Sequence, residues 1–554
     1  MQFSTCTDLS RFYWWLLVFL PSSLLAFTDD FFAASSVRRI KRGLSDVCWS
    51  KEDERCYDGL GCYPCLHKQH AQSPEHINMV FYLHTTSNTT NQTFWYLDLL
   101  DQSSQRLQSL SFDATRHMWV IIHGFEGQWP LPWIQLQTTA LLSRGSNNVL
   151  VARWTEGVAY PHNYPQAASN ARVVGAMIGR VLLALKQRSN LDFQRTHLIG
   201  FSLGVPVAGF TGAWLNGTVK QIVGLDPAGK YYEGEPTAER LDAGDAQFVQ
   251  VIHTHGAPLS QGGLGTMQPM GDVDFYVNGG LAQPGCPVSK RKNFSITKFY
   301  NIIEVVGCNH LRAPALFTDS ILSSCRYKAY PCASETEWAQ GLCFSCGTAG
   351  GCLNMGYPLD PDTQLRGKFF LSTILEEGIR KGNYCGNNYR VSLIPDREVH
   401  GKLKVTLMNE GRAVRRVNFQ QKSDILPVSG KSAILAAPYP RVSAMRLYYD
   451  RYNVLVEKGV EVFGLRAASV SSDTGELFGS NCTVRVEDDA TTVVRLYAGV
   501  GFADALTASS TVHGQLGNVS FCPGHFVSAA DRSLLTALLL PVLLTWYLAF
   551  CLLR

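Results

Sequence analysis

The stretch HLIGFSLG (residues 197–204) contains the pattern G-x-S-x-G, with Ser202 at its centre. A short apolar run precedes the serine and the apolar segment 205–215 follows it, which predicts a strand, a sharp turn and a helix. Such a turn exposes the serine, and a glycine two residues away on each side relieves the crowding. The helix that follows directs its amino end at the serine and favours negative charge there. The alternative is an ordinary turn serine.

Strand and helix patterns alternate on both sides of this motif. The runs MWVIIHGF (118–125), NNVLVARW (147–154) and VKQIVGL (219–225) are short, β-rich and bounded by turn formers. Apolar residues recur at helical spacing over 164–188. This alternation predicts an α/β fold with a mostly parallel sheet that helices cover on both faces. Sites in such folds lie beyond the carboxyl ends of the strands.

A serine hydroxyl needs a base to activate it, and the base needs an acid that orients it. In a fold of this kind, the acid and then the base follow the serine along the chain. Asp226, in GLDPAG, is the candidate acid, although a turn aspartate before a proline is the plainer interpretation. His253, His255 and His310 all follow it, and spacing alone does not choose the base among them.

Six pieces of sequence then occur in a fixed order: HLIGFSLG, VGLDPAG, VIHTHGAP, NGG, PGC and CNHLRAP. Together they resemble the pancreatic lipase family, which includes lipoprotein, hepatic and endothelial lipases and phospholipases A1. The resemblance covers roughly residues 47–522. It implies an α/β-hydrolase domain over 43–385, followed by a PLAT-like antiparallel β-sandwich over 386–522.

The resemblance also implies roles for individual residues. His310, in C-N-H-L-R, becomes the base beside Ser202 and Asp226, so that His253 and His255 become structural residues at a strand end. The backbone N–H groups of Phe125 and Leu203 become the oxyanion hole. No catalytic cofactor is implied, but a structural calcium ion is, and the alternative there is a solvated acidic turn. Its expected ligands are the carboxylates of Asp242 and Asp245 and the carbonyl groups of Thr237 and Arg240, although relatives commonly carry Glu where Thr237 stands.

The chain has 16 cysteines, which indicates an oxidising compartment. By resemblance, Cys286 and Cys308 close a lid over 287–307, whose apolar and basic residues suit an anionic lipid surface. A plain disulfide-closed loop is the alternative. Two more bridges, Cys48–Cys65 and Cys325–Cys385, are guesses. The other bridges implied by resemblance are Cys56–Cys62, Cys332–Cys343, Cys346–Cys352 and Cys482–Cys522.

Beyond about residue 388, alternating β-branched runs separated by polar turns predict the antiparallel sandwich from the sequence itself. Hydrophobic residues make up 46% and charged residues 17% of the chain, which excludes disordered and collagen-like proteins. The net charge of +4 gives no reason to expect nucleic acid as a partner.

The two ends of the chain predict export to the cell surface. Residues 1–26 read as a signal peptide, and 27–42 as a propeptide that ends in the basic string RRIKR, which is otherwise a solvated basic patch. A spacer, 523–533, precedes the apolar segment 534–554, which predicts a GPI signal, a membrane span or, failing both, a buried core helix. Six glycosylation acceptors fit that location: Asn88, Asn91, Asn216, Asn293, Asn481 and Asn518.

The hypothesis is therefore an extracellular, membrane-anchored serine lipase. Its expected substrates are triacylglycerol, the sn-1 ester of phospholipids, or both, at a lipid interface. Further expected partners are the membrane itself, a helper protein, and heparan sulfate through basic residues such as 412–416, which scattered surface charge explains equally well. The alternative function is a non-catalytic lipid-binding or adhesion protein on the same scaffold.

Overall fold

In a computed structural model of the chain, the described residues lie mainly within 52–472. The breaks are 87–91, 100–108, 111, 126–129, 146, 159–162, 287–295, 348–350, 360–362, 375–383, 410–411, 414–416, 421–424, 439–440 and 452–461, and only short strands are described beyond 472. The chain forms two compact units. The first contains most of the chain up to Cys385, and the second contains Gly386 onward together with Ser334–Ser345 and Ser372–Leu375.

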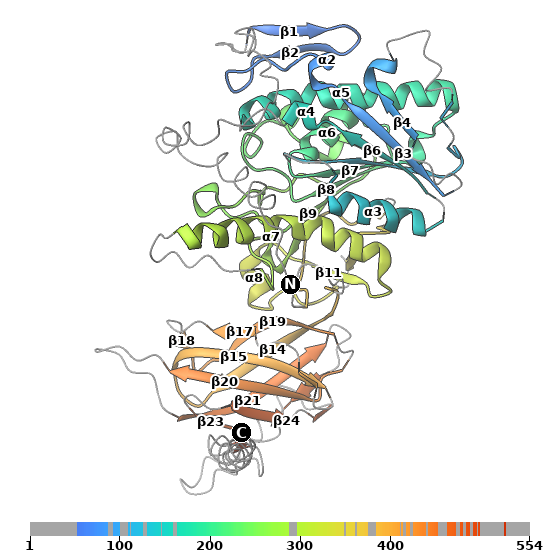
Figure 1. Cartoon of the computed structure of the whole chain (residues 1–554). Helices are drawn as coiled ribbons and strands as arrows, with labels where there is room; N and C mark the ends of the chain where they lie inside the picture. Colours follow the sequence, from blue (N-terminus) through green and yellow to red (C-terminus); the bar gives the residue numbers. More distant parts are fainter. Residues whose placement is uncertain are drawn as a thin grey trace, which may run out of the picture. The chain divides into compact units, whose positions relative to one another are not determined.

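A sheet of eleven strands organises the first unit (Figure 1). Seven neighbouring strands, β6, β5, β7, β8, β9, β10 and β13, pair in parallel, which confirms the mostly parallel sheet predicted from the sequence. Antiparallel strands extend the sheet at both sides. The strands are β3 (Val80–Thr85), β4 (Gln92–Trp95), β5 (His117–Ile122), β6 (Asn147–Arg153), β7 (Thr196–Phe201), β8 (Gln221–Leu225), β9 (Val249–His253), β10 (Val273–Val277), β11 (Tyr327–Pro331), β12 (Leu353–Met355) and β13 (Gly367–Leu371).

Helices cover both faces of this sheet, as predicted (Figure 1). On one face, α5 (Tyr164–Ser189) and α6 (Gly204–Trp214) bury their apolar residues against the strands. On the other face, α3 (Pro132–Ser143) and α7 (Ile296–Leu322) do the same. The smaller elements are β1 (Glu54–Tyr57), β2 (Gly61–Pro64), α2 (Pro74–Ile77), η3 (Tyr96–Leu99), α4 (Thr155–Val158), η4 (Phe193–Arg195), η5 (Thr237–Glu239), η6 (Ala243–Asp245), η7 (Leu259–Gln261) and η8 (Asn278–Gly280).

Helix α5 is the longest element of the first core cluster. The side chain of Asn163 accepts a hydrogen bond from the Gln166 N–H and begins the helix, and Asn190, at φ 56°, ends it in the left-handed conformation. Among the described helices, α5 alone has the length and hydropathy that a membrane span needs, but 78% of its apolar window is buried inside the protein. That burial is what a core helix requires.

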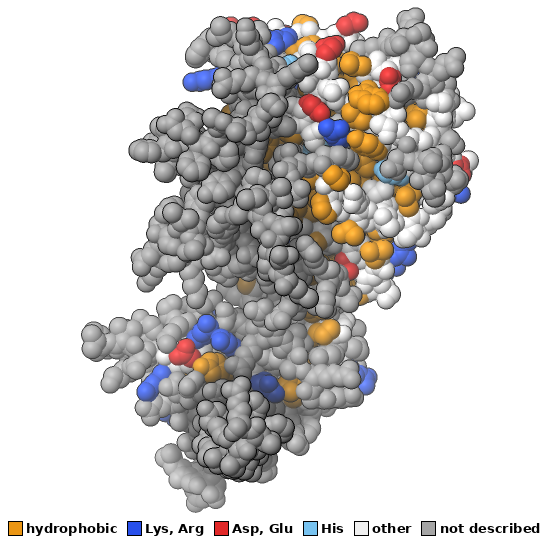
Figure 2. Space-filling view, in the orientation of Figure 1, with side chains coloured by type: hydrophobic (Ala, Val, Ile, Leu, Met, Phe, Trp, Pro, Cys, Tyr) orange, Lys and Arg blue, Asp and Glu red, His pale blue; other side chains and the backbone are white. Residues whose placement is uncertain are grey.

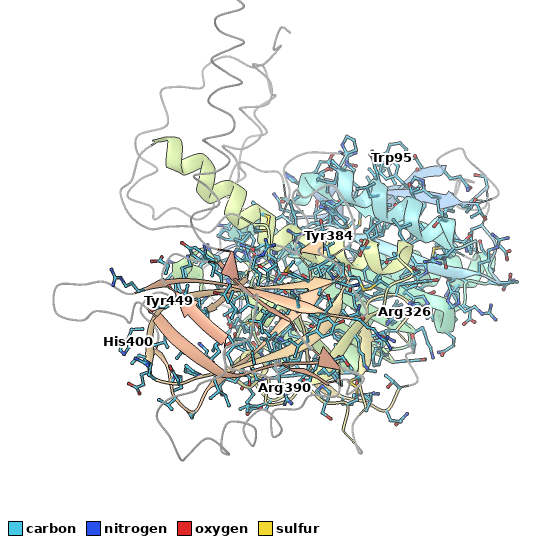
Figure 3. All side chains as sticks on the ribbon, turned by 90° about the horizontal axis from the view of Figure 1, so that it is seen from below. Trp95, Arg326, Tyr384, Arg390, His400 and Tyr449 are labelled. Atoms are coloured by element: carbon cyan, nitrogen blue, oxygen red, sulfur yellow. A yellow bond between two sulfur atoms is a disulfide. The ribbon has the colours of Figure 1, made fainter. Side chains whose placement is uncertain are left out.

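The second unit is an antiparallel β-sandwich, as predicted. Its described strands form two sheets around one apolar core cluster, and at one end the Tyr449 hydroxyl donates a hydrogen bond to the His400 carbonyl at 2.8 Å (Figure 3). One sheet contains β14 (Asn387–Pro395), β19 (Lys431–Ala437), β21 (Val462–Ser472), β22 (Leu477–Gly479), β23 (Val484–Glu487) and β25 (Tyr497–Ala498). The other contains β15 (Val399–Asn409), β16 (Arg412–Ala413), β17 (Val417–Gln420), β18 (Ile425–Leu426), β20 (Ala444–Arg451), β24 (Thr491–Arg495) and β26 (Phe526–Val527), and α8 (Glu335–Ala339) belongs to the same unit.

Figure 2 shows one side of each unit, and the described side chains visible there differ in kind. In the first unit, apolar side chains gather on this face. In the second unit, the charged side chains visible there are mostly Lys and Arg.

Candidate active site

Ser202 lies in a strained turn between β7 and α6. Its φ is 56°, in the left-handed region that a side chain with a Cβ rarely adopts. Three backbone hydrogen bonds hold it there: its N–H donates to the Leu225 carbonyl at 3.0 Å, and its carbonyl accepts from Val205 at 3.0 Å and Ala228 at 3.2 Å. The strain is therefore maintained by the neighbouring strand and by the first turn of the helix, as in a nucleophile elbow.

The two glycines of G-x-S-x-G are required by close packing. A Cβ at Gly200 would lie 2.3 Å from the Gly204 carbonyl oxygen, and a Cβ at Gly204 would lie 2.3 Å from the Ile122 carbonyl oxygen. Neither position has room for a methyl group. The pattern that the sequence displays is thus the one that lets β7, the turn and β5 approach each other.

Asp226 follows β8 and is completely buried. One carboxylate oxygen, Oδ2, accepts a hydrogen bond from His310 Nδ1 at 2.5 Å. The other, Oδ1, accepts from the backbone N–H groups of Thr254 at 2.8 Å and His255 at 2.9 Å. Burial raises the pKa of Asp226. The hydrogen bond and charge of His310, the charge of His255 and the hydrogen bond from the Thr254 N–H together outweigh burial and hold the pKa below its usual value.

His310 is brought to this carboxylate by helix α7. Its ring is 1% exposed and lies 4.6 Å from the ring of Phe201, the residue that precedes the serine. Because an ionised carboxylate only accepts hydrogen bonds, the ring proton lies on Nδ1 and Nε2 is left as the basic nitrogen. The structure thus places Ser202, Asp226 and His310 at one edge of the sheet, on three separate elements.

The other two histidines left open by the sequence lie elsewhere. The ring of His253 contacts Asp274 and not Asp226, with Nε2 at 2.8 Å from Asp274 Oδ1. His255 contacts Asp226 through its backbone N–H, and burial lowers the pKa of its imidazole to about 4. Of the three histidines, His310 is the one whose ring nitrogen forms a hydrogen bond with the Asp226 carboxylate.

The loop after β5 packs directly on the serine. A Cβ at Gly124 would lie 2.7 Å from the Ser202 Cβ and 3.2 Å from the Leu203 nitrogen. Phe125 comes next along this loop, and Leu203 is the N-cap of α6. Of the two residues expected to supply backbone N–H groups to an oxyanion, Leu203 therefore follows Ser202 directly, and Phe125 follows the glycine that packs on Ser202.

His123 anchors this loop in a way that the sequence did not suggest. Its Nδ1 donates to the Gly124 carbonyl at 2.9 Å, and its Nε2 accepts from the Trp154 N–H at 3.0 Å. The Trp154 indole donates in turn to the His123 carbonyl at 2.9 Å. Burial lowers the pKa of His123 to about 4, so the ring is neutral and keeps one donor and one acceptor nitrogen.

The two predicted calcium-binding carboxylates lie together at η6, while Thr237 and Arg240 begin and follow η5. Asp242 is the N-cap of η6, and Asp245 is its last residue. The Asp242 N–H donates to Asp245 Oδ2 at 2.9 Å, and the Gly244 N–H donates to Asp242 Oδ1 at 2.6 Å. Burial, with the neighbouring charge of Asp242, raises the pKa of Asp245 to about 7. The carbonyl of Thr237 accepts from the Arg240 N–H at 3.3 Å. Two adjacent carboxylates, one of them buried, fit a hard divalent cation.

A second cluster of metal-ligand residue types has a different explanation. Cys332, Glu337 and Cys343 have ligand atoms within 4.8 Å of one another. Both cysteines are already in disulfides, so their sulfur atoms are not thiolate ligands. Among the described residues this is the one group of three or more such side chains, and it is not a metal site.

The other cysteines lie mostly within the described residues. Cys65 is in a disulfide, whereas its guessed partner Cys48 lies outside the described residues, as do Cys482 and Cys522. Of the expected lid, residues 287–295 also lie outside, and the backbone from Ile296 onward forms the first turns of α7. The structure contains the bridges Cys56–Cys62, Cys286–Cys308, Cys325–Cys385 and Cys346–Cys352.

Most of the predicted surface features fall outside the described residues. Of the six glycosylation acceptors, Asn216 alone is described, and its side chain is exposed just after α6. Asn88, Asn91, Asn293, Asn481 and Asn518 lie outside, as do the signal peptide, the basic string and the apolar segment 534–554.

The comparison with protein families decides the family. The model of the lipase family matches residues 50–377, more than half of the chain. This chain belongs to the lipase family. The α/β unit that carries Ser202, Asp226 and His310 is the part that the family match covers.

Named relatives of this lipase-family chain can be aligned with most of its length. It is 31% identical over 464 residues to the pancreatic triacylglycerol lipase of Ictidomys tridecemlineatus, covering 79% of this chain and 95% of that protein. It is 33% identical to human pancreatic lipase-related protein 2, covering 66% and 79% of the two chains. It is also 36% identical to mouse inactive pancreatic lipase-related protein 1, covering 66% and 78%. Because one relative is named inactive, family membership leaves activity to be argued from the site.

Proposed function

We propose that this protein hydrolyses carboxyl esters of lipids through a serine-bound acyl intermediate. The observation that carries the proposal is the buried contact of 2.5 Å between His310 Nδ1 and Asp226 Oδ2, at the sheet edge where Ser202 occupies its strained turn. A carboxylate held by two backbone N–H groups orients the imidazole and stabilises the imidazolium that forms during the reaction.

The proposed reaction has two halves. The Ser202 oxygen attacks the ester carbonyl carbon while His310 Nε2 takes the hydroxyl proton, and the tetrahedral oxygen is stabilised by the N–H groups of Leu203 and Phe125. The tetrahedral intermediate collapses, the bond to the alcohol breaks, and His310 returns its proton to that alcohol. Water then attacks the acyl-enzyme with His310 as base, which releases the fatty acid and restores Ser202.

Exposed apolar residues near the site support a lipid as substrate. Leu259 and Leu281 lie in loops that follow the carboxyl ends of β9 and β10, and Leu311 is the neighbour of His310. Large apolar side chains exposed around a catalytic edge suit contact with an aggregated lipid. The proposed substrates are triacylglycerol, the sn-1 ester of phospholipids, or both, with the Cys286–Cys308 bridge tethering the lid.

We also propose that Asp242 and Asp245, with the carbonyl groups of Thr237 and Arg240, bind a structural calcium ion. A divalent cation would offset the repulsion of the two carboxylates and stabilise the loop that follows β8. Addition of calcium should then raise Tm, and Asp242→Asn should abolish the increase while the unfolding transition remains cooperative.

The proposed location is the outside of the cell. Export fits the disulfides. The sequence is the basis for proposing attachment to the membrane through 534–554, contact with heparan sulfate through 412–416, and a helper protein as a further partner. A phosphatidylinositol-specific phospholipase should release the protein from cells. Retention, while a known GPI-anchored protein is released, would indicate a membrane span.

A fluorophosphonate probe tests the central proposal. The wild-type ectodomain should be labelled and should hydrolyse triolein or phosphatidylcholine, whereas Ser202→Ala should do neither. A monogalactosyl lipid assayed in parallel shows how broad the headgroup tolerance is. If well-folded wild-type protein is neither labelled nor active, the proposal fails and the protein joins the non-catalytic binders, as the name of one relative illustrates.

A further inference from the structure

The loop from Thr254 to Thr266 fixes the side of Asp226 that faces away from the base. Its first two N–H groups, of Thr254 and His255, donate to Asp226 Oδ1. Its far end also packs on the carboxylate, since a Cβ at Gly265 would lie 2.6 Å from the same Oδ1 atom. Any displacement of this loop therefore changes the direction in which Asp226 presents Oδ2 to His310.

His253, the last residue of β9, closes this loop. Its Nδ1 lies 2.7 Å from the Thr266 carbonyl oxygen, and its Nε2 lies 2.8 Å from Asp274 Oδ1. Asp274, on β10, also accepts the N–H groups of Met270 at 3.0 Å and Gly271 at 3.1 Å. The histidine thus ties the end of the loop to the strand beside it.

Hydrogen-bond partners surround the His253 ring on both sides. A carbonyl oxygen only accepts, so Nδ1 donates to Thr266. Nε2 faces Asp274 Oδ1, and the same carboxyl group also accepts two backbone N–H groups. The ring of Tyr276 is stacked on the imidazole, with the ring centroids 4.5 Å apart. The ring of His253 is therefore held in one orientation between the end of the loop and β10.

We propose that His253 and Asp274 are positioning residues, which hold the loop 254–266 against Asp226 and so set the orientation of His310. This inference rests on the proposed function, because it assigns the pair to the reaction of Ser202. It gives the chain two buried His–Asp pairs with different tasks. In the His310–Asp226 pair the imidazole takes and returns a proton, whereas the His253–Asp274 pair holds the backbone of the loop in place.

A second connection shows why the loop and His310 move together. Gln283 Nε2 donates to the Thr254 carbonyl at 3.0 Å, and the Gln283 N–H donates to Asn309 Oδ1 at 2.6 Å. Asn309 is the neighbour of His310 on α7. The start of the loop is therefore attached to the helix that carries the base, whereas its end depends on His253.

Two substitutions of His253 separate its two contacts. The amide nitrogen of Asn takes the position of Nδ1, so His253→Asn keeps the contact with Thr266. The amide nitrogen of Gln takes the position of Nε2, so His253→Gln keeps the contact with Asp274 and loses the loop. We expect kcat to fall about a hundredfold in His253→Gln with KM unchanged, and by no more than about tenfold in His253→Asn.

A control is available at another His–Asp pair. His70 is buried and its Nε2 lies 3.1 Å from Asp53 Oδ2, whose side chain is 55% exposed. Because solvent screens this pair, His70→Gln should lower Tm less than His253→Gln does, and it should leave kcat unchanged. Equal losses of kcat in His70→Gln and His253→Gln, or equal activity in the two His253 variants, would overturn the inference.

Hydrogen exchange keeps the test independent of the proposed function. In His253→Gln, amide exchange should accelerate in peptides that cover 254–266 and remain unchanged in the rest of the sheet. Unaltered exchange there refutes the loop contact even if the wild type is active, while an inactive wild type with accelerated exchange refutes only the hydrolase proposal. Should His253→Gln not fold, Asp274→Asn, which keeps the side-chain volume, is measured in the same way.

Discussion

The two ends of the parallel strands in the first unit use histidine in opposite ways. At the carboxyl ends, His310 Nδ1 lies 2.5 Å from a carboxylate, that of Asp226. At the amino ends, His117 Nδ1 lies 2.9 Å from another histidine nitrogen, His197 Nε2. A carboxylate stabilises a proton gained by its partner, whereas a second imidazole competes for that proton. Burial alone therefore does not make a base, and the charge of the partner decides.

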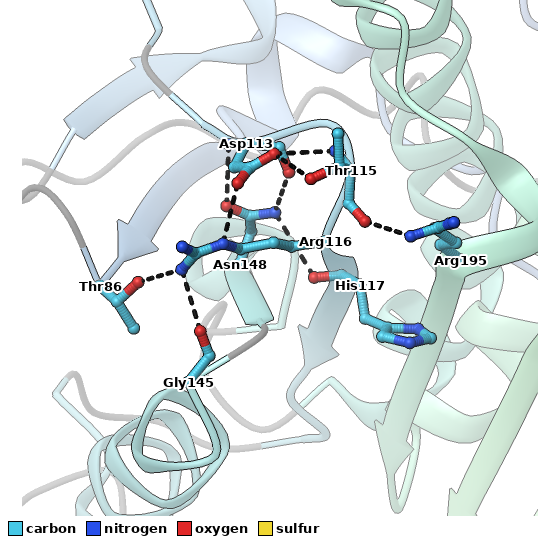
Figure 4. A network of polar contacts seen from close by, with 8 residues as sticks. All are labelled: Thr86, Asp113, Thr115, Arg116, His117, Gly145, Asn148 and Arg195. Carbon is cyan, nitrogen blue, oxygen red and sulfur yellow. Dashed lines mark hydrogen bonds and ion pairs between the residues drawn. The ribbon is translucent and has the colours of Figure 1, made fainter.

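The backbone differs between these two edges as well. Ser202 and Asp226, at the carboxyl edge, have φ values of 56° and 45°, in the left-handed region. At the amino edge, a network of Asp113, Thr115, Arg116 and Asn148 ties the entry to β5 to its neighbours without such strain (Figure 4). The strained backbone conformations therefore lie at the carboxyl edge, where we propose the chemistry. At the amino edge, partly solvent-exposed hydrogen bonds hold the strand ends in place.

The largest effect should come from Asp226→Asn. The amide keeps the volume, but it carries no charge to stabilise a protonated His310 and presents a donor where an acceptor is needed. We expect kcat on a soluble p-nitrophenyl ester to fall about ten-thousandfold, with KM changed little. Ser202→Ala defines the background rate, and Tm controls for folding. A fall of less than about tenfold would show that the carboxyl edge does not act through this carboxylate.

Gly265→Ala should have the next largest effect. Its methyl group would lie 2.6 Å from Asp226 Oδ1, so the loop must move and the carboxylate with it. A displacement of about 1 Å near a catalytic group typically lowers kcat by about a hundredfold.

Gly145→Ala is the matched substitution at the amino edge. Gly145 has φ 76° and open space around its Cβ position, so the substitution introduces strain without a clash. It should cost about 1–2 kcal/mol of unfolding free energy and leave kcat unchanged. Urea unfolding and steady-state kinetics on both variants make the comparison, which fails if both lose activity alike.

The His117–His197 pair should make stability depend on pH. Burial lowers the pKa of His197 to about 3, and it also lowers the pKa of His117. Unfolded His197 takes up a proton below about pH 6.5, while folded His197 stays neutral down to about pH 3. The stability that His197 contributes is therefore fully present above pH 6.5 and falls by about 1.4 kcal/mol per pH unit as the pH is lowered toward 3. The exposed His117 shifts in the same direction.

His197→Asn tests that dependence, because its amide nitrogen can still donate to Gln221, which His197 Nδ1 contacts at 3.1 Å. The slope of unfolding free energy against pH between 4 and 6 should decrease by about 1.4 kcal/mol per pH unit. Urea midpoints over this range give the slope, and His123 and His255 contribute equally in both proteins. An unchanged slope would mean that His197 is not neutral in the folded state.

The sequence predicted the parts of this edge that local patterns encode. The strand and helix on either side of Ser202 were expected at 197–201 and 205–215 and are found at Thr196–Phe201 and Gly204–Trp214. The apolar run over 164–188 is helix α5. Each of these elements has an apolar period or a turn residue that can be recognised without its neighbours.

Other parts of the site could not be predicted because they depend on packing between distant segments. Spacing left His253, His255 and His310 equivalent, and the family resemblance chose His310; the contact with Asp226 arises only when α7 is placed on the sheet. The role of Trp154 as a donor to His123 has no local signal. For Asp274, the weak signal was an acidic residue in a strand-like run, GDVDFY.

The smallest effect should come from Arg116→Ala at the amino edge. The guanidinium donates to Asp113 Oδ2 at 2.9 Å and to the Gly145 carbonyl at 3.0 Å, and it is about one-third exposed (Figure 4). Water can replace such contacts and salt screens them, so the variant should show a small fall in Tm that diminishes with added salt. Because this network lies at the strand ends opposite Ser202, kcat/KM should remain unchanged. A loss of activity beyond about twofold, at unchanged Tm, would mean that a change at the amino edge alters the catalytic edge through the strands. The two edges would then not have separate tasks.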